Sequence, residues 1–178
     1  SSIEVEDTKT AYILSEYFAK ILKKKTLAID FDPQCNMSKL LLNMEVDPAF
    51  PDGVLPPIHP DYNPNDPDDS EWDGRSSIAD IFFGEPIVPY ESRIENLDIS
   101  PGHAMKLLDT ESVRRHEIAE KVHKQLHVLL NSKELQEEYE VVVIDTAPSK
   151  GPLTISAIRA ATHIFIPAIM EEQVVQGV

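Results

Sequence analysis

The sequence contains only one cysteine, Cys35, among 178 residues. A single thiol excludes a disulfide framework within the chain and any metal cluster that needs four thiolates from it. No apolar run reaches the roughly 18 to 20 residues of a membrane-spanning helix, and the N-terminus shows no signal-peptide pattern. From these absences we expect a cytoplasmic protein without a membrane partner.

Positive charge is also scarce: 16 Lys and Arg face 31 Asp and Glu, a formal net charge of -15. Such a chain has no overall field that attracts DNA, so DNA contact would need a local patch or segments outside these residues. The basic run at residues 23–25 is too short to define such a site. A nucleotide is not excluded, because a few backbone N–H groups and one Mg²⁺ hold its phosphates.

Apolar residues with helical spacing alternate with short apolar runs along the chain. Helices are predicted over residues 10–22, 37–44, 77–83, 111–136 and 151–161, and strands over residues 26–33, 96–102, 140–148 and 163–167. Alternating strands and helices predict an α/β fold with a mostly parallel sheet flanked by helices on both faces. The length suits a single domain.

One segment departs from this pattern. Residues 47–73 contain seven prolines and eight acidic residues, with few large apolar side chains. We therefore treat residues 47–74 as an acidic insert that forms no regular element, as a long surface excursion or a partly disordered segment.

Three aspartates follow the two clearest strands. Asp30 and Asp32 end one strand and Asp145 ends the other. Parallel strands end at one edge of a sheet, so these carboxylates are expected to lie together, where open α/β folds bind ligands. One such aspartate is as well explained by a helix cap, but all three together favour a Mg²⁺–phosphate site.

Residues 30–36 (DFDPQCN) and 144–151 (IDTAPSKG) resemble the two signature segments of the ParA-type partition ATPases, deviant Walker A P-loop NTPases that include MinD. Residues 97–102 and 165–167 are similar to strand endings of that family. The resemblance covers residues 8–178 apart from the insert. It implies a three-layer P-loop NTPase-like fold, with residues 1–178 as one nucleotide-hydrolase domain and the family's C-terminal portion missing.

The resemblance also implies roles for individual residues. Asp32 would be catalytic and orient the water that attacks the γ-phosphate, and Asp145 would hold magnesium through water. Asp30 would lie beside the phosphates, and Gln34 would respond to the nucleotide state.

Further nucleotide contacts follow from the same resemblance. Thr8 would ligate magnesium through its hydroxyl, and its neighbours would contact the nucleotide. The turn after the last strand would approach the base. The residues implied in these contacts are Lys9, Thr10, Pro167, Glu171 and Gln173.

The N-terminus departs from the family, which has a glycine-rich loop of the form KGGxGKT. No glycine precedes Gly53 here, and the family's loop lysine falls on Asp7. Either the loop is lost and the protein is nucleotide-incompetent, or residues are missing between Asp7 and Thr8. We favour missing residues, because the carboxylates on the magnesium side are retained.

The function implied is that of an ATPase with ATP and Mg²⁺ as cofactors. A nucleotide-sandwich homodimer would bind DNA non-specifically, and a ParB-type centromere-binding protein would stimulate hydrolysis, so that plasmid or chromosomal DNA is segregated on the bacterial nucleoid. Two alternatives stay open: a nucleotide-incompetent regulator that acts through protein contacts, and a MinD-like membrane-cycling ATPase. The latter needs a C-terminal amphipathic helix, which these residues do not contain.

Overall fold

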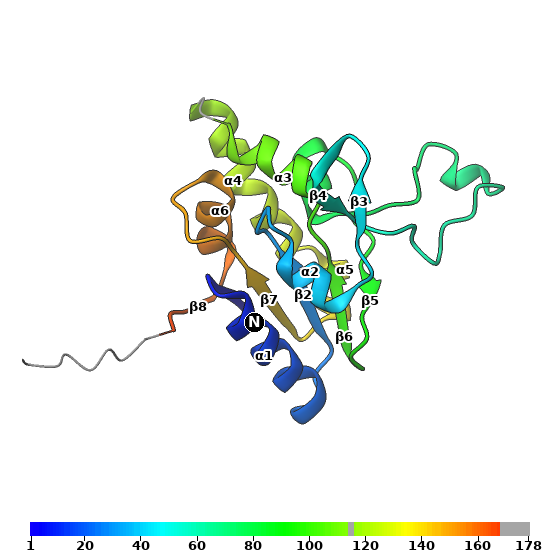
Figure 1. Cartoon of the computed structure of the whole chain (residues 1–178). Coiled ribbons are helices and arrows are strands. Elements are labelled where there is room, and N and C mark those ends of the chain that lie inside the picture. Colours follow the sequence, from blue (N-terminus) through cyan, green and yellow to red (C-terminus); the bar gives the residue numbers. More distant parts are fainter. Residues whose placement is uncertain (114–115, 168–178) are drawn as a thin grey trace, which may run out of the picture.

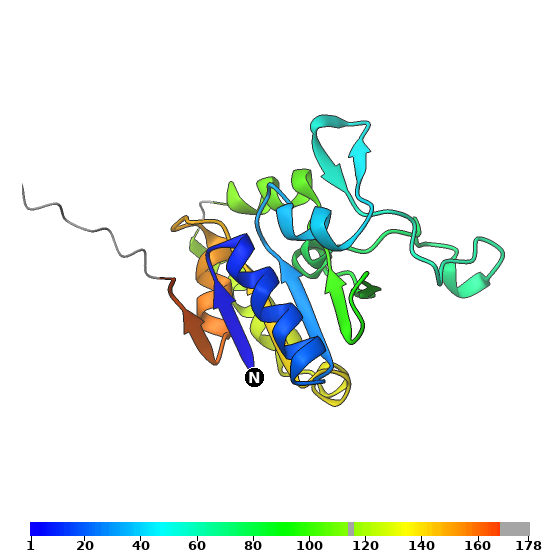
Figure 2. The ribbon, with the colours of Figure 1, turned by 60° about the horizontal axis from the view of Figure 1, so that its bottom comes forward.

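The computed structural model describes residues 1–113 and 116–167 (Figures 1 and 2). Its centre is a six-stranded sheet with the order β5-β6-β2-β7-β1-β8, in which every neighbouring pair is parallel except β5 and β6. The predicted mostly parallel sheet is therefore confirmed. The strands are β1 (Ser2–Val5), β2 (Thr26–Asp30), β5 (Tyr90–Glu91), β6 (Leu97–Ser100), β7 (Val141–Asp145) and β8 (His163–Phe165).

Helices cover both faces of this sheet, with α1 in front of it and α6 behind it in Figure 2. The helices are α1 (Thr8–Glu16), which continues as the π-helix η1 (Tyr17–Ile21), α2 (Asn36–Leu41), the 3₁₀ helix η3 (Ile78–Phe83), α3 (Ala104–Glu111), α4 (His116–Leu130), α5 (Lys133–Glu138) and α6 (Pro152–Ala160). None of the described helices is long and apolar enough to cross a membrane.

The two faces of the central strands carry side chains of different size. Leu27 and Ile144 lie in the large core cluster that includes residues of α4 and α6. On the other face, Ala28 packs with Ala19 of η1, and Val143 packs with Ala11 of α1. All five residues of β2 and of β7 are buried, as expected for strands covered on both faces.

The prediction of one helix over residues 111–136 is wrong. This stretch contains the last residue of α3, then α4 and α5 as separate helices. Ser132 interrupts the pattern because it begins α5 as its N-cap, its hydroxyl accepting a hydrogen bond from the backbone N–H of Leu135 at 3.4 Å. Serine at such a position competes with continued helix by bonding the backbone locally.

The connection between β1 and α1 consists of Glu6 and Asp7 alone. Asp7 is the N-cap of α1, and its carbonyl oxygen accepts a hydrogen bond from the backbone N–H of Ala11 at 2.9 Å. The chain runs without a break from Asp7 to Thr8. No glycine-rich loop separates β1 from α1 in the described residues, and the interpretation that residues are missing at this point stays a prediction.

The acidic insert contains regular structure, contrary to expectation. A hairpin is formed by β3 (Glu45–Asp47) and β4 (Phe50–Leu55), and a 3₁₀ turn, η2 (Pro67–Asp69), lies further along. The hairpin forms because Phe50 and Val54 pack against the main core. Residues 56–75, the acidic extension, project from the body of the domain at the right of Figure 1.

An aromatic cluster anchors the acidic extension to the domain. His59 is 5% exposed, its ring lies 4.4 Å from that of Tyr90 and 5.8 Å from that of Trp72, and its Nε2 lies 2.9 Å from the carbonyl oxygen of Pro89. Trp72 donates its indole N–H to the carbonyl oxygen of Arg75 at 2.7 Å. These contacts hold a proline-rich segment in one conformation without a core of its own.

We expect His59→Ala to release the acidic extension while the sheet stays folded. Loss of the ring contacts and of the Pro89 bond should remove about 1–2 kcal/mol of local stability, which is about a tenfold faster cleavage within residues 60–71. Limited proteolysis after acidic residues measures this. Ile58→Ala, at a side chain that is 47% exposed, is the control. Equal cleavage of both variants would contradict the anchoring role of His59.

Candidate functional site

The parallel register places two buried carboxylates side by side at the carboxyl edge of the sheet. Asp30 of β2 lies opposite Asp145 of β7, and Asp145 lies opposite Val5 of β1. Asp30 is 0% exposed and Asp145 is 1% exposed. Two carboxylates out of water disfavour ionisation of each other, so this edge requires protons, hydrogen-bond donors or a cation.

Asp30 obtains its compensation from the protein. One of its carboxylate oxygens accepts hydrogen bonds from the backbone N–H and the hydroxyl of Ser38, at 2.9 and 2.6 Å, and the other accepts from the backbone N–H of Asp32 at 3.1 Å. The Ser38 hydroxyl also accepts from the N–H of Gly102 at 2.9 Å. Burial nevertheless raises the pKa of Asp30 to about 6. Asp30 thus fixes the loop that carries Asp32.

Asp145 is only half compensated. Its Oδ2 accepts a hydrogen bond from the hydroxyl of Thr8 at 2.8 Å. Its Oδ1 is buried and has no hydrogen-bond partner in the described part of the chain. Burial, together with the charge of Asp30, raises the pKa of Asp145 to about 8. An unpaired buried carboxylate oxygen is costly, so this carboxyl requires a proton or a bound cation.

The predicted residues of the neighbouring loop lie nearer the surface. Asp32 is half-buried, and its Oδ1 accepts a hydrogen bond from the backbone N–H of Gln34 at 2.9 Å. Gln34 is exposed. Cys35 follows in a left-handed conformation with φ of 55°, and its thiol is buried. The thiol therefore fills space under the loop, and burial raises its pKa, which disfavours the nucleophilic thiolate.

The residues of this edge fit magnesium. Thr8 and Asp145 together offer a hydroxyl and a carboxylate, the hard oxygen donors that Mg²⁺ prefers, and Mg²⁺ keeps several waters beside such ligands. The unpartnered Oδ1 of Asp145 gives the ion a reason to bind, because it would compensate that oxygen and stabilise the ionised form.

The phosphate side fits less well. Lys9 is exposed in the first turn of α1, and the hydroxyl of Thr10 donates to the carboxylate of Asp7. Beside them lies an open hollow of about 730 Å³ lined by Glu6, Asp7, Thr8, Lys9, Tyr12, Asn36 and Leu40. The N-terminus of α1 and Lys9 favour an anion here, whereas the carboxylates of Glu6 and Asp7 oppose one.

Of the three residues predicted to approach the nucleotide base, the structure describes only one. Pro167 is exposed and lies two residues beyond β8. Glu171 and Gln173 lie outside the described residues.

Two acidic residues of this region were missed in the sequence. Glu4 lies in the middle of β1, is 1% exposed and accepts a hydrogen bond from the hydroxyl of Thr146; burial raises its pKa. Glu111, at the end of α3, accepts a hydrogen bond from the backbone N–H of Leu153 at 3.2 Å. The position of Glu4 between the apolar Ile3 and Val5 was a sequence signal that could have identified it. The role of Glu111 depends on packing between helices distant in sequence and had no such signal.

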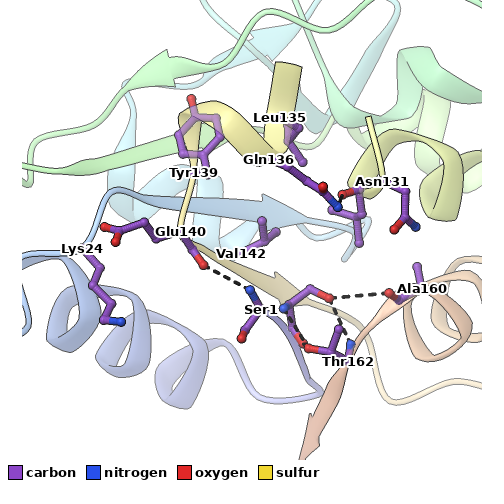
Figure 3. A pocket seen from close by; sticks show the side chains of 12 residues that line it. Ser1, Lys24, Asn131, Leu135, Gln136, Tyr139, Glu140, Val142, Ala160 and Thr162 are labelled. Atoms are coloured by element: carbon purple, nitrogen blue, oxygen red, sulfur yellow. Dashed lines mark hydrogen bonds between the residues drawn. The ribbon is translucent and has the colours of Figure 1, made fainter. Parts of the chain in front are cut away.

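Another hollow, of about 480 Å³, lies at the opposite edge of the sheet, where the strands begin (Figure 3). Its polar groups bond one another: the Ser1 nitrogen donates to the carbonyl oxygen of Glu140 at 3.1 Å, and the Ser2 hydroxyl donates to that of Ala160 at 3.5 Å. Among the described residues, no buried side-chain oxygen or nitrogen that lines this hollow lacks a hydrogen-bond partner, unlike Oδ1 of Asp145.

We expect the free energy of unfolding of the domain to decrease as the pH rises, unless Mg²⁺ is present. The folded-state pKa of Asp145, about 8, lies above its unfolded value near 3.9, so its favourable contribution is complete below about pH 4 and is lost as the pH rises through about 8. The raised pKa of Asp30 adds a further decrease in stability as the pH rises to about 6.

The loss from Asp145 should amount to about 2–5 kcal/mol, since one pKa unit between the states corresponds to about 1.4 kcal/mol. Urea unfolding at several pH values measures it. Millimolar Mg²⁺ should restore stability at high pH, and Asp145→Asn should abolish both the pH loss and the Mg²⁺ effect. A pH profile that is the same in Asp145→Asn would contradict this assignment.

The comparisons with known proteins agree with this geometry. The chain matches a family model described as AAA domain over residues 4–178. It is 26% identical over 176 residues to the chromosome-partitioning ATPase Soj of Treponema pallidum, an alignment that covers 97% of this chain and 56% of that protein. The chain thus spans little more than half the length of this relative.

Two solved structures share the fold. An ATP complex of an McdA variant from Cyanothece has a TM-score of 0.62 and 18% identity, covering 94% of this chain and 56% of that one. The structure of pNOB8 ParA bound to nonspecific DNA has a TM-score of 0.57 and 16% identity, covering 92% and 52%. The chain therefore belongs to this AAA domain family, and the relatives that it matches support the resemblance to ParA-type partition ATPases.

Proposed function

We propose that this chain binds ATP with Mg²⁺ at the Asp145 edge and hydrolyses it as part of a DNA-partition cycle. The observation that carries the proposal is the unpartnered, buried Oδ1 of Asp145 beside the hydroxyl of Thr8. Its carboxylate is adjacent to Asp30 and to the loop of Asp32, as the resemblance to ParA-type ATPases implies. Relatives named as a partition ATPase and as an ATP complex support the same assignment.

In this proposal each residue of the edge has one task. Thr8 and Asp145 hold the hydrated Mg²⁺, which when bound neutralises charge on the phosphate oxygens. Asp30 holds the loop through its bonds to Ser38 and Asp32. Asp32, half-buried at the surface of that loop, orients a water for attack. Lys9, Thr10 and Gln34 contribute nucleotide contacts.

The wider cycle is proposed from the family. An ATP-dependent homodimer would bind DNA non-specifically, through segments other than the acidic surface described here, because a net charge of -15 repels phosphates. A ParB-type protein would stimulate hydrolysis, on the bacterial nucleoid. That a ParA structure was solved with nonspecific DNA supports the DNA component.

The two-residue connection Glu6–Asp7 favours a second candidate. It brings two carboxylates where the family has a glycine-rich loop and lysine. A protein of this kind would keep the cation side and act through protein contacts without turning over ATP. Calorimetry separates the candidates: heat on titration with Mg²⁺–ATP supports the ATPase, and heat with Mg²⁺ alone but none with Mg²⁺–ATP beyond it supports the regulator.

We expect Asp32→Ala to retain Mg²⁺–ATP binding and to lose hydrolysis by about 10²-fold or more, because water positioning is lost while Thr8 and Asp145 remain. Phosphate release and calorimetry on the same samples measure the two effects. Asp61→Ala, an exposed carboxylate of the acidic extension, is the control. Equal turnover by Asp32→Ala and the parent chain would remove Asp32 from this role.

We also expect Asp7→Lys to tighten Mg²⁺–ATP binding by about tenfold or more, because a cation replaces a carboxylate at the N-terminus of α1. Asp109→Lys makes the same charge change at an exposed position of α3 and should leave affinity within about threefold. Calorimetry at constant ionic strength measures both. An equal gain in the two variants would mean that net charge alone is responsible.

A further inference from the structure

Glu111 connects two helices beside the loop that follows Asp145. Glu111 is the last residue of α3, and its Oε1 accepts the hydrogen bond from the backbone N–H of Leu153, in the first turn of α6, at 3.2 Å. The loop in between, residues 146–151, connects Asp145 of β7 to α6. Glu111 therefore reaches the far end of the loop from a different part of the chain.

The start of α6 needs this external oxygen. Gly151 is the N-cap and has no side chain to accept a hydrogen bond, and Pro152 has no backbone N–H. Leu153 is thus the first helical residue with an N–H to satisfy. A carboxylate at this end is also favoured by the helix dipole. Glu111 supplies from α3 the cap that α6 does not provide for itself.

Gly151 makes room for the contact. A Cβ at this position would lie 1.9 Å from the Oε2 of Glu111, which is far inside van der Waals contact. Glycine and glutamate are therefore a matched pair. The φ of Gly151 is -74°, so its backbone conformation does not require glycine; a Cβ here would instead displace the carboxylate end of the flexible Glu111 side chain.

The first turn of α6 in turn holds the loop. The hydroxyl of Thr154 donates to the carbonyl oxygen of Ala147 at 3.0 Å and lies 3.2 Å from the hydroxyl of Ser149. Burial and, to a smaller extent, the charge of Asp32 raise the pKa of Glu111. The Glu111 side chain thus joins α3 to the first turn of α6, and that turn holds the loop that follows Asp145.

We propose that Glu111 is a positioning residue of the cation site: by capping α6 from outside and fixing residues 146–151, it holds Asp145 where Mg²⁺ needs it. This inference rests on the proposed cation site. It assigns no contact between Glu111 and the ion. Partners of this kind around metal ligands change metal affinity by about 10–100-fold when they are removed.

The test uses amide hydrogen exchange and calorimetry with Mg²⁺ alone. Glu111→Ala should speed exchange within residues 149–153 and weaken Mg²⁺ binding by about tenfold or more. Glu111→Gln keeps an acceptor oxygen and should restore both to within about threefold of the parent chain. Asp109→Ala, an exposed carboxylate on the same helix, should change neither.

A double-mutant cycle tests the pairing itself. Gly151→Ala should weaken Mg²⁺ binding as Glu111→Ala does, because the new methyl group displaces the carboxylate. Once Glu111 is alanine, the same change at Gly151 should cost little more, so the two effects should not add.

Each remaining outcome overturns the inference. Unchanged exchange in Glu111→Ala would mean that the cap is dispensable. Faster exchange with unchanged Mg²⁺ affinity would make Glu111 a stability cap only, while the proposed function stands. Absence of Mg²⁺ binding by the parent chain would overturn the proposed cation site and, with it, this inference.

Discussion

The structure depends on two carboxylates placed side by side by the register of a parallel sheet. Asp30 and Asp145 are opposite residues of β2 and β7, both buried, and each disfavours ionisation of the other. The two carboxylates differ in the hydrogen bonds that they accept. Ser38 donates two hydrogen bonds to Asp30, whereas Thr8 donates one to a single oxygen of Asp145. The remaining oxygen is buried without a hydrogen-bond partner in the described part of the chain, and the proposed cation site rests on it.

Local patterns predicted the part of the site that lies on the strands. The apolar runs ending in Asp30 and Asp145 predicted two buried parallel strands and one shared edge, and both are confirmed. Such runs encode burial on both faces, and parallel pairing then fixes which ends meet. The roles of Asp32 and Gln34 came from family resemblance and stay predictions.

Features that depend on contacts between distant segments could not be predicted. The Glu111 cap arises from packing of α3 against α6, and the hairpin of the insert forms because Phe50 and Val54 find the core. The many prolines and acidic residues of the insert did not predict that hairpin. The overall composition of a segment does not show whether a few of its apolar side chains pack against the core. The direct passage from Glu6–Asp7 into α1 is visible in the sequence, and the interpretation that residues are missing there stays a prediction.

The measurement that tests this account most directly is the titration of the Asp145 carboxyl carbon by NMR, with and without Mg²⁺. Without the ion, the carboxyl should titrate near pH 8, several units above an ordinary aspartate. With saturating Mg²⁺, it should stay ionised throughout the neutral range. A titration that Mg²⁺ leaves unchanged would contradict the claim that this edge is a cation site.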